Sequence, residues 1–460
     1  MLSENLVESL SDAIKKQLNS NSEEKVKKFL FDNFLDPMIQ HSIHVSICID
    51  NKSGTSLNMS LIHKLLALIG KTVSKLNLKY GQKLFDKLIE FSTLGAVDQL
   101  LPSVPPTCFC TYQMGPQFLV TLNDSQALIV FILISELISN LKYEIRAKQS
   151  IELFDKLFEF SINHKNQEIC RLASKSTGVL VNRFDSNNDV LNEKLRQILS
   201  FFTEKLFDSE VSDEKETLII DVLVWITKGL VIRKHSQRNG FIDLLISLCE
   251  HQNHVIRTQV SKGFEAIHRS DESCLTEENN AIVTLLYNQR FYFETFEPLL
   301  RGYLKHKNQN SDKKQTFLTA LLTQLNYITK PVFRTQLKSL VPMLLDAIDG
   351  EGVEGNQRAA LEAISQIMID KNHQILNPSL KSFANNCINL SINSPFLRVR
   401  RSALNCLALI ADTFDDSDIS YLRETMVRDL RKALNDKKRV VRKSAVTARC
   451  KWILVGQPGK

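Results

Sequence analysis

An arginine returns every 42 residues near the C-terminal end of this chain. Arg358, Arg400 and Arg442 each open a stretch whose apolar residues recur at helical spacing. Basic residues open similar stretches earlier, with spacings of 42 to 57 residues, at Arg171, Lys215, Arg257 and Lys314. A period of 42–44 residues is typical of repeats built from two or three helices. One such helix pair cannot bury its apolar face alone, so the period predicts a stack of repeats with one continuous core.

The grouping of residues around each arginine indicates the HEAT type of repeat. Val-Arg followed by a nearby alanine occurs at Arg400 and at Arg442, and Asp436 stands six residues before Arg442. We therefore expect Arg358, Arg400, Asp436 and Arg442 to belong to a repeat framework, with Asp436 as the turn aspartate that accompanies the helix arginine Arg442. A first helix is predicted before each of these second helices, over 193–207, 241–250, 294–305, 334–347, 378–391 and 420–434.

The composition also favours an all-α fold. Glycine and proline together number only 26, from 15 and 11, whereas average usage of about 12% would give roughly 55. Sheets and barrels need many turn residues, so this deficit argues against them. The longest wholly apolar run is Ala127–Ile134, far shorter than the roughly 20 residues of a membrane span. The prediction is an all-α HEAT-repeat α-solenoid of antiparallel helix pairs, with about 42–44 residues per repeat.

The regular repeats do not extend over the whole chain. Prolines cluster between residues 102 and 116, which indicates a loop and a soft domain boundary. We predict a less regular helical segment over 1–124 and a HEAT-repeat domain over 125–460. The segment Phe291–Phe296 falls in the longest gap between repeat arginines, and we expect it to mark an irregular repeat.

No residue pattern predicts catalysis or cofactor binding. The nine cysteines are scattered, which is typical of reduced thiols in a cytosolic or nuclear protein. Cys108-x-Cys110 lacks the second short-spaced pair of a zinc site. Gly350–Gly355 matches G-x-G-x-x-G, but a predicted helix precedes it and two glutamates would repel phosphate. We predict a turn there, no catalytic residue, no metal, no cofactor and no enzymatic activity.

Positive charge is concentrated near the C-terminus. Between Arg428 and Lys451 ten basic residues face two acidic ones, so this window carries +8 and the remaining residues sum to about −1. The simplest interpretation is a polar terminal cap with framework arginines. An acidic protein partner is the second interpretation. Nucleic acid is the least favoured, because Trp452 is the only aromatic residue in or beside the window.

The C-terminal sequence resembles a known family. The pattern D-K-K-R-x-V-R-K-x-A-V-x-A-R begins at Asp436, and two further segments, 222–235 and 287–300, are similar in the same order. The chain is thereby identified as a member of the MMS-nineteen, or nucleotide excision repair, family. This family comprises HEAT-repeat adaptors of the cytosolic iron–sulfur cluster assembly (CIA) targeting complex. The likeness covers about residues 125–460 and resembles the C-terminal half of longer proteins, so we expect N-terminal repeats to be missing here.

The resemblance implies a non-enzymatic adaptor located in the cytoplasm and nucleus. Its implied partners are the cluster-transfer subunit, the WD40-propeller subunit and apo iron–sulfur clients such as helicases, polymerases and primases of DNA replication and repair. The hypothesised contact residues are Lys437, Lys438, Arg439 and Lys443. Two alternatives stay open: a helical-repeat transport-receptor or phosphatase-type scaffold, and a DNA-repair factor that binds nucleic acid directly. Neither the clients nor the binding face nor the oligomeric state follows from the sequence.

Overall fold

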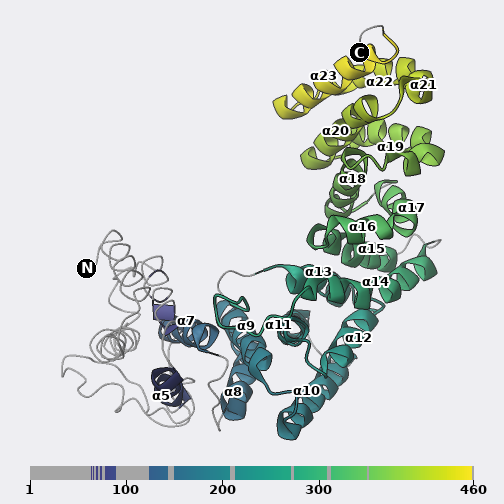
Figure 1. The fold of residues 1–460 in the computed structure, drawn as a ribbon. Coiled ribbons are helices and arrows are strands. Elements are labelled where there is room, and N and C mark those ends of the chain that lie inside the picture. Colours follow the sequence, from purple (N-terminus) through teal and green to yellow (C-terminus); the bar gives the residue numbers. More distant parts are fainter. Residues whose placement is uncertain are drawn as a thin grey trace. The chain divides into compact units, whose positions relative to one another are not determined.

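The computed structural model divides the chain into two compact units, Met1–Phe291 and Tyr292–Lys460 (Figure 1). It describes residues 78–89, 124–142, 150–207, 213–270, 274–307, 312–349 and 352–457, with a few positions between 64 and 74. The division falls inside helix α14 (Tyr287–His306). The sequence does not predict this division. The proposed boundary near residue 124 adjoins residues outside the described ranges, so it stays a prediction.

The first unit is a stack of antiparallel helix pairs. Its described helices are α5 (Leu78–Ile89), α7 (Asp124–Asn140), α8 (Ser150–Asn163), α9 (Gln167–Arg183), α10 (Asp189–Phe207), α11 (Asp213–Arg233), α12 (Arg238–Leu248) and α13 (His254–His268). Helices α8 and α9, α10 and α11, and α12 and α13 pack as pairs, while α7, α9, α11 and α13 contact one another in series. The second helices of the pairs therefore form one continuous layer.

The second unit repeats this arrangement. After α14 come α15 (Asp312–Gln324), α16 (Lys330–Thr335), α17 (Leu337–Ile348), α18 (Glu354–Ile369), α19 (Leu380–Asn393), α20 (Leu397–Thr413), α21 (Asp416–Ile419), α22 (Arg423–Ala433) and α23 (Arg439–Leu454). One layer contains α17, α19 and α22, and the other contains α15, α18, α20 and α23. Short 3₁₀ turns at Leu325–Tyr327, His373–Ser379 and Ser420–Leu422 connect some of these helices.

The predicted all-α solenoid is confirmed, and each unit is such a solenoid. Helices α18, α20 and α23 begin at Glu354, Leu397 and Arg439, which reproduces the period in the sequence. No β-strand occurs among the residues that the structure describes. Within the same ranges, no helix is both long and apolar enough to span a bilayer.

Burial follows the helical stripes. In α20 the buried residues recur every three or four positions and include Val399, Ala403, Leu407 and Ile410. The last helix is joined to this core by Trp452, which is fully buried and whose indole N–H donates to the carbonyl of Leu407 at 2.9 Å. A buried tryptophan contributes several kcal/mol, about 3–5 by truncation to alanine. The terminal helix pair is therefore a packed part of the second unit.

The longest gap between repeat positions, from Arg257 to Lys314, is explained by additional residues between two helices. Phe291–Phe296 lies within the regular helix α14. The additional residues instead form an irregular segment, 274–286, between α13 and α14; we call it the strap. It crosses the C-terminal ends of α7, α9 and α11 in turn. The repeat that contains Phe291–Phe296 is therefore irregular through the strap that precedes α14, and α14 itself contains Pro298.

The strap hydrogen bonds to these helix ends. Asn280 donates to the carbonyl of Asn140 at 3.0 Å, at the end of α7. Asn182, in the last turn of α9, accepts from the backbone N–H of Ile282 at 2.9 Å and donates to its carbonyl at 3.1 Å. Thr284 donates through its backbone and hydroxyl groups to the carbonyl of Ile232, in α11. Because the last carbonyls of a helix have no partner within it, the strap satisfies groups that would otherwise be unpaired.

Two sequence features stand partly or wholly outside the described residues. Cys108 and Cys110 lie there, as do Gly350 and Glu351 of the glycine motif. Gly352 precedes α18 and Gly355 lies in its first turn. The described part of the motif is therefore the connection between two helices, as predicted.

Candidate protein-docking site

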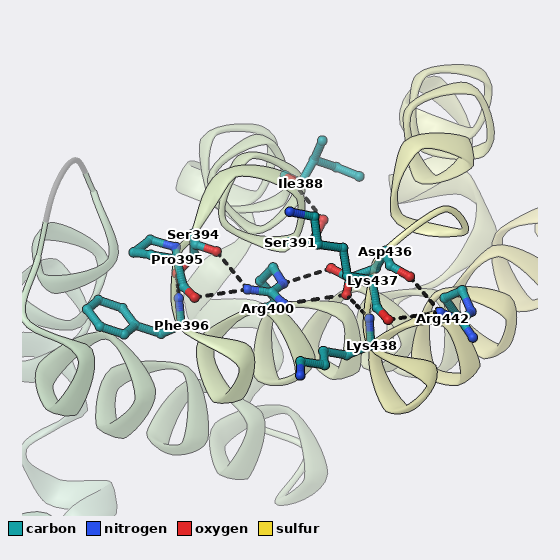
Figure 2. Close-up of polar contacts among 10 residues, drawn as sticks. All are labelled: Ile388, Ser391, Ser394, Pro395, Phe396, Arg400, Asp436, Lys437, Lys438 and Arg442. Atoms are coloured by element: carbon teal, nitrogen blue, oxygen red, sulfur yellow. Dashed lines mark hydrogen bonds and ion pairs between the residues drawn. The ribbon is translucent and has the colours of Figure 1, made fainter.

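Three of the turns that precede second helices share one arginine geometry. Arg400 donates from one Nη atom to the carbonyls of Ser394 and Pro395, at 3.0 and 3.1 Å. Arg442 does the same to Asp436 and Lys437, at 2.7 and 3.2 Å (Figure 2). In the first unit Arg257 donates to His251 and Gln252, at 2.8 and 2.7 Å. Each arginine thus clamps the carbonyls five and six residues before it, which holds the turn in one conformation.

The arginine that clamps the turn always lies four residues after the N-cap residue of its helix. The caps Asn253, Phe396 and Lys438 precede Arg257, Arg400 and Arg442 by that interval. In α9 the same position, counted from Asn166, is occupied by Cys170, whose thiol donates to the carbonyl of His164 at 3.2 Å. Arg171, singled out in the sequence, is one residue beyond the clamp and is exposed.

The framework prediction for Arg358 is not met. The cap of α18 is Val353, so the clamp position belongs to the buried Gln357. One residue corresponds to about 100° of rotation around a helix, and Arg358 consequently points elsewhere. Its Nε atom lies 3.6 Å from Glu362, one turn later on the same helix.

Arg400 and Asp436 form the contact between repeats that the framework requires. Nε and an Nη atom of Arg400 donate to the two carboxylate oxygens of Asp436, at 2.8 and 3.4 Å. Both side chains are largely buried, with 12% and 11% exposed. Figure 2 shows Arg400 between the Ser394–Pro395 turn and Asp436, and Arg442 on the other side of Asp436. The pair connects α20 to the turn before α23.

Asp436 also organises its own turn. Its carboxylate accepts from the backbone N–H of Lys438 at 2.7 Å. Burial disfavours the charged carboxylate, but the hydrogen bonds from Lys438 and Arg400 and the positive charge of Arg442 outweigh it, so the pKa of Asp436 lies below its ordinary value. The carboxylate is therefore ionised at neutral pH and holds the turn from both sides.

Four exposed cations surround this rigid turn, and we call them the basic cluster: Lys437, Lys438, Arg439 and Lys443. The first two lie in the turn, and the others lie in the first turns of α23. Within residues 352–457, no hydrogen bond or ion pair engages any of the four side chains. Cations near a helix N-terminus lie against the positive end of the helix dipole, so their placement does not stabilise α23. These charges are available to a partner.

Three other basic residues of the same window have polar partners, in contrast to the basic cluster. Arg428 pairs with Asp429 at 3.0 Å, and Arg449 donates to the carbonyl of Val427 at 3.2 Å. Lys451 forms an ion pair with Asp412. Arg431 is exposed, like the basic cluster, and engages no partner in residues 352–457. The sequence could not separate these groups, because all of them appear in it simply as positive charges.

The described residues offer no alternative chemistry. The described cysteines form no disulfide: five of them are buried thiols, and Cys450 is an exposed thiol. Among the described residues no three His, Cys, Asp or Glu side chains are grouped in a way that could hold a metal ion. His251, near His254 in the sequence, accepts the backbone N–H of Asn253 at 3.0 Å through Nδ1 and so belongs to a turn.

Related sequences match most of the chain. The family model described as RNAPII transcription regulator C-terminal (MMS19_C) matches residues 2–411. An MMS19 nucleotide excision repair protein homolog of Xenopus laevis is 30% identical over 289 residues, which is 62% of this chain and 27% of that protein. The homolog of Homo sapiens is 24% identical over 403 residues, 88% of this chain and 37% of that protein. The DNA repair/transcription protein mms19 of Schizosaccharomyces pombe is 22% identical over 463 residues, 98% of this chain and 42% of that protein.

The chain thus spans less than half the length of the curated relatives it matches. Solved structures with a similar helical arrangement include a mutant of the karyopherin Kap121p, with a TM-score of 0.45, 12% identity, and coverage of 98% of this chain and 42% of the other. An engineered protein has a TM-score of 0.39 and 14% identity, with coverage of 97% and 99%. The fold is established by the helices of this chain and by their packing.

Proposed function

Because this chain belongs to the MMS19 family, whose C-terminal family model matches residues 2–411, we propose that it is a non-catalytic adaptor for proteins of DNA repair and transcription. The names of its relatives connect them to nucleotide excision repair and to transcription. Stacked helical repeats provide extended surfaces for protein partners.

The finer form of the proposal is a role in the CIA targeting complex. The chain would hold the cluster-transfer and WD40-propeller subunits together with apo iron–sulfur clients such as helicases, polymerases and primases, in the cytoplasm and nucleus. A scaffold of this kind raises the effective concentration of carrier and client without contacting the iron. No metal and no catalytic residue of this chain is needed for that role.

One observation carries the proposal for the docking site. The basic cluster is unpaired in residues 352–457, whereas Arg442 and Asp436 beside it form hydrogen bonds within the turn. A protein surface gains little stability from unpaired cations near a helix N-terminus. We therefore assign the basic cluster to contacts with an acidic surface of the cluster-transfer subunit.

The test reverses the charge of the basic cluster. A variant with Lys437→Glu, Lys438→Glu, Arg439→Glu and Lys443→Glu should melt near the temperature of the unchanged chain, because no side-chain contact is lost. It should bind the purified transfer subunit several kcal/mol more weakly, since each exposed pair contributes about 0–1 kcal/mol. The loss should appear mainly in the association rate and increase at low salt.

Two controls separate the possible outcomes. Lys338→Glu with Lys381→Glu places reversed charge on α17 and α19, in the other helix layer, and should leave binding unchanged. Duplex and single-stranded DNA are measured in parallel, since binding of DNA that is lost with the basic cluster would favour a nucleic-acid factor. If the fourfold variant binds the transfer subunit undiminished, the assigned site is wrong.

A further inference from the structure

A polar groove lies between α18 and α20, away from the basic cluster. Its volume is about 500 Å³, and it is lined by one face of each helix. Arg358, Glu362 and Ile369 come from α18, and Arg398, Arg401 and Leu409 come from α20. All six lie on faces that the core of the unit does not bury.

The arginines of this groove are not required by the fold. Arg398 and Arg401 are exposed and engage no hydrogen-bond or ion-pair partner within residues 352–457. Arg358 has only the 3.6 Å contact with Glu362. Arg400, between the two arginines of α20, shows the contrast, because its guanidinium is fully used in the turn and on Asp436. Three guanidinium groups face one glutamate, so the groove is cationic.

The groove differs between its two ends. Ser365 of α18 contacts Cys406 of α20 at 3.2 Å. The two helices run in the same direction, because they are the corresponding second helices of successive repeats. The three arginines consequently gather at the N-terminal ends of the helices. Ile369, 56% exposed, and Leu409 lie at the C-terminal ends. One end of the groove suits carboxylates and the other suits an apolar side chain.

We propose that this groove binds a short, extended, acidic segment of a partner protein, whose carboxylates meet Arg358, Arg398 and Arg401 and whose apolar side chain lies on Ile369 and Leu409. The planar guanidinium group matches a carboxylate with two parallel hydrogen bonds. Arg401 and Leu409 are eight residues apart, or about 12 Å along the helix. An extended chain covers that distance in three or four residues of about 3.3 Å each. The acidic and apolar residues of the segment should therefore be separated by that number of positions.

A peptide fits the groove better than a nucleic acid does. None of the side chains lining it is aromatic, so bases would find no stacking surface of the kind that single-strand binding proteins provide. Glu362 would repel a continuous line of phosphates, and the apolar end would contribute nothing to them. A peptide segment with a few carboxylates and one apolar residue can contact both the cationic end and the apolar end of the groove.

This inference stands apart from the proposed function. It depends only on the groove, and none of its residues belongs to the basic cluster. Charge reversal in the basic cluster tests binding of the transfer subunit, whereas charge reversal of the groove arginines tests binding of the peptide. The two results are independent, so each proposal can fail alone.

The experiment measures peptide binding by fluorescence anisotropy with the full 460-residue chain. The probes are fluorescein-labelled ten-residue peptides with two adjacent glutamates and a leucine placed two to five positions away. Glutamine copies of each peptide report the contribution of charge. The variant Arg398→Glu with Arg401→Glu is compared with the unchanged chain, and Arg398→Gln with Arg401→Gln serves if charge reversal impairs folding. Lys338→Glu with Lys381→Glu is the matched control on the other helix layer.

We expect tightest binding at a spacing of three or four, and a Kd about tenfold higher for the glutamine copy and for either arginine variant. The control on α17 and α19 should leave the Kd unchanged. Equal binding of acidic and glutamine peptides would overturn the proposal, as would undiminished binding by the arginine variants. A single-stranded oligonucleotide that binds more tightly than every peptide, and is lost with the same arginines, would overturn the assignment to a protein segment.

Discussion

The two units differ in the arginines that connect one repeat to the next. In the first unit Arg183, Arg233 and Arg290 each donate to a carbonyl near the C-terminal end of another helix, on Ser139, Asn182 and Val231. This unit also has an N-terminal clamp, at Arg257. In the second unit Arg400 and Arg442 act at N-terminal turns. A cation is favoured by the helix dipole at a C-terminus and disfavoured at an N-terminus. The arginines of the second unit therefore need turn carbonyls and, for Arg400, the carboxylate of Asp436.

The strap adds to this difference. It joins the ends of three helices in the first unit, and a single segment of 13 residues thereby supports three repeats. In the second unit Arg400 and Arg442 each hold the turn before their own helix, and Arg400 also contacts Asp436 in the turn of the next repeat. One repeat period therefore accommodates two ways of joining neighbours: a segment distant in the sequence joins several helix ends in the first unit, and a pair from adjacent repeats, Arg400 and Asp436, joins them in the second.

The largest expected change in stability concerns the close contact between the backbones of α9 and α11 in the first unit. A Cβ at Gly229 would lie 2.2 Å from the carbonyl oxygen of Gly178, so α9 and α11 would have to separate. Gly229→Ala should lower the free energy of unfolding by about 3 kcal/mol. Gly355→Ala, in the first turn of α18, meets nothing within 4 Å and should raise it by about 0.5 kcal/mol. Urea unfolding of both variants measures the difference, and equal effects would contradict the packing described for α9 and α11.

The next effect tests the strap. Asn182→Ala removes hydrogen bonds to Gly229 and to both backbone groups of Ile282. Several buried backbone groups would lose their partners, at a cost of about 2–3 kcal/mol. Hydrogen exchange measured by mass spectrometry should show faster exchange in the strap and at the ends of α9 and α11. The matched control is the exposed Asn385→Ala in α19; if it accelerates exchange in the strap as much, the strap is not held by Asn182.

A smaller effect is expected in the second unit. Arg400→Ala removes the pair with Asp436 and two turn hydrogen bonds, and should cost about 2 kcal/mol. Arg442→Ala removes only turn hydrogen bonds and should cost about 1 kcal/mol. The pKa of Asp436 is lowered in the folded chain, so its stabilising effect is present above its ordinary pKa and is lost as pH falls through the lowered value. The loss of unfolding free energy caused by Arg400→Ala should consequently become smaller in acid. A loss that does not depend on pH would argue against an ion pair between Arg400 and Asp436.

The smallest effect is a pH dependence confined to the first unit. His235 is buried, and its Nδ1 accepts the backbone N–H of Gln237 at 3.2 Å. Burial, with the nearby charge of Arg233, lowers its pKa to about 4. The unfolded chain then binds more protons between pH 6.5 and 4, so stability falls as pH falls through that window, by about 1 kcal/mol from pH 7 to 5.5. His235→Asn should flatten this slope in urea unfolding, while the exposed His254→Asn should leave it unchanged.

The sequence by itself determined the helices and their period, and it singled out Arg400, Asp436 and Arg442 without specifying what each of them contacts. These features depend on residues close together along the chain, where helical spacing and turn length are sufficient to specify the geometry. The position of the basic cluster follows from the same local pattern, and its role in docking stays a prediction.

Only the tertiary structure decided the remaining features. Arg358 fits the period of 42 residues, yet one residue of offset at the cap of α18 rotates it out of the clamp and into the groove beside Arg401. The strap contacts Asn140 and Asn182 across 140 and 100 residues of sequence, and no local pattern specifies such partners. The physical reason is that helix periodicity fixes which residues share a face, whereas the packing of distant segments fixes what that face meets.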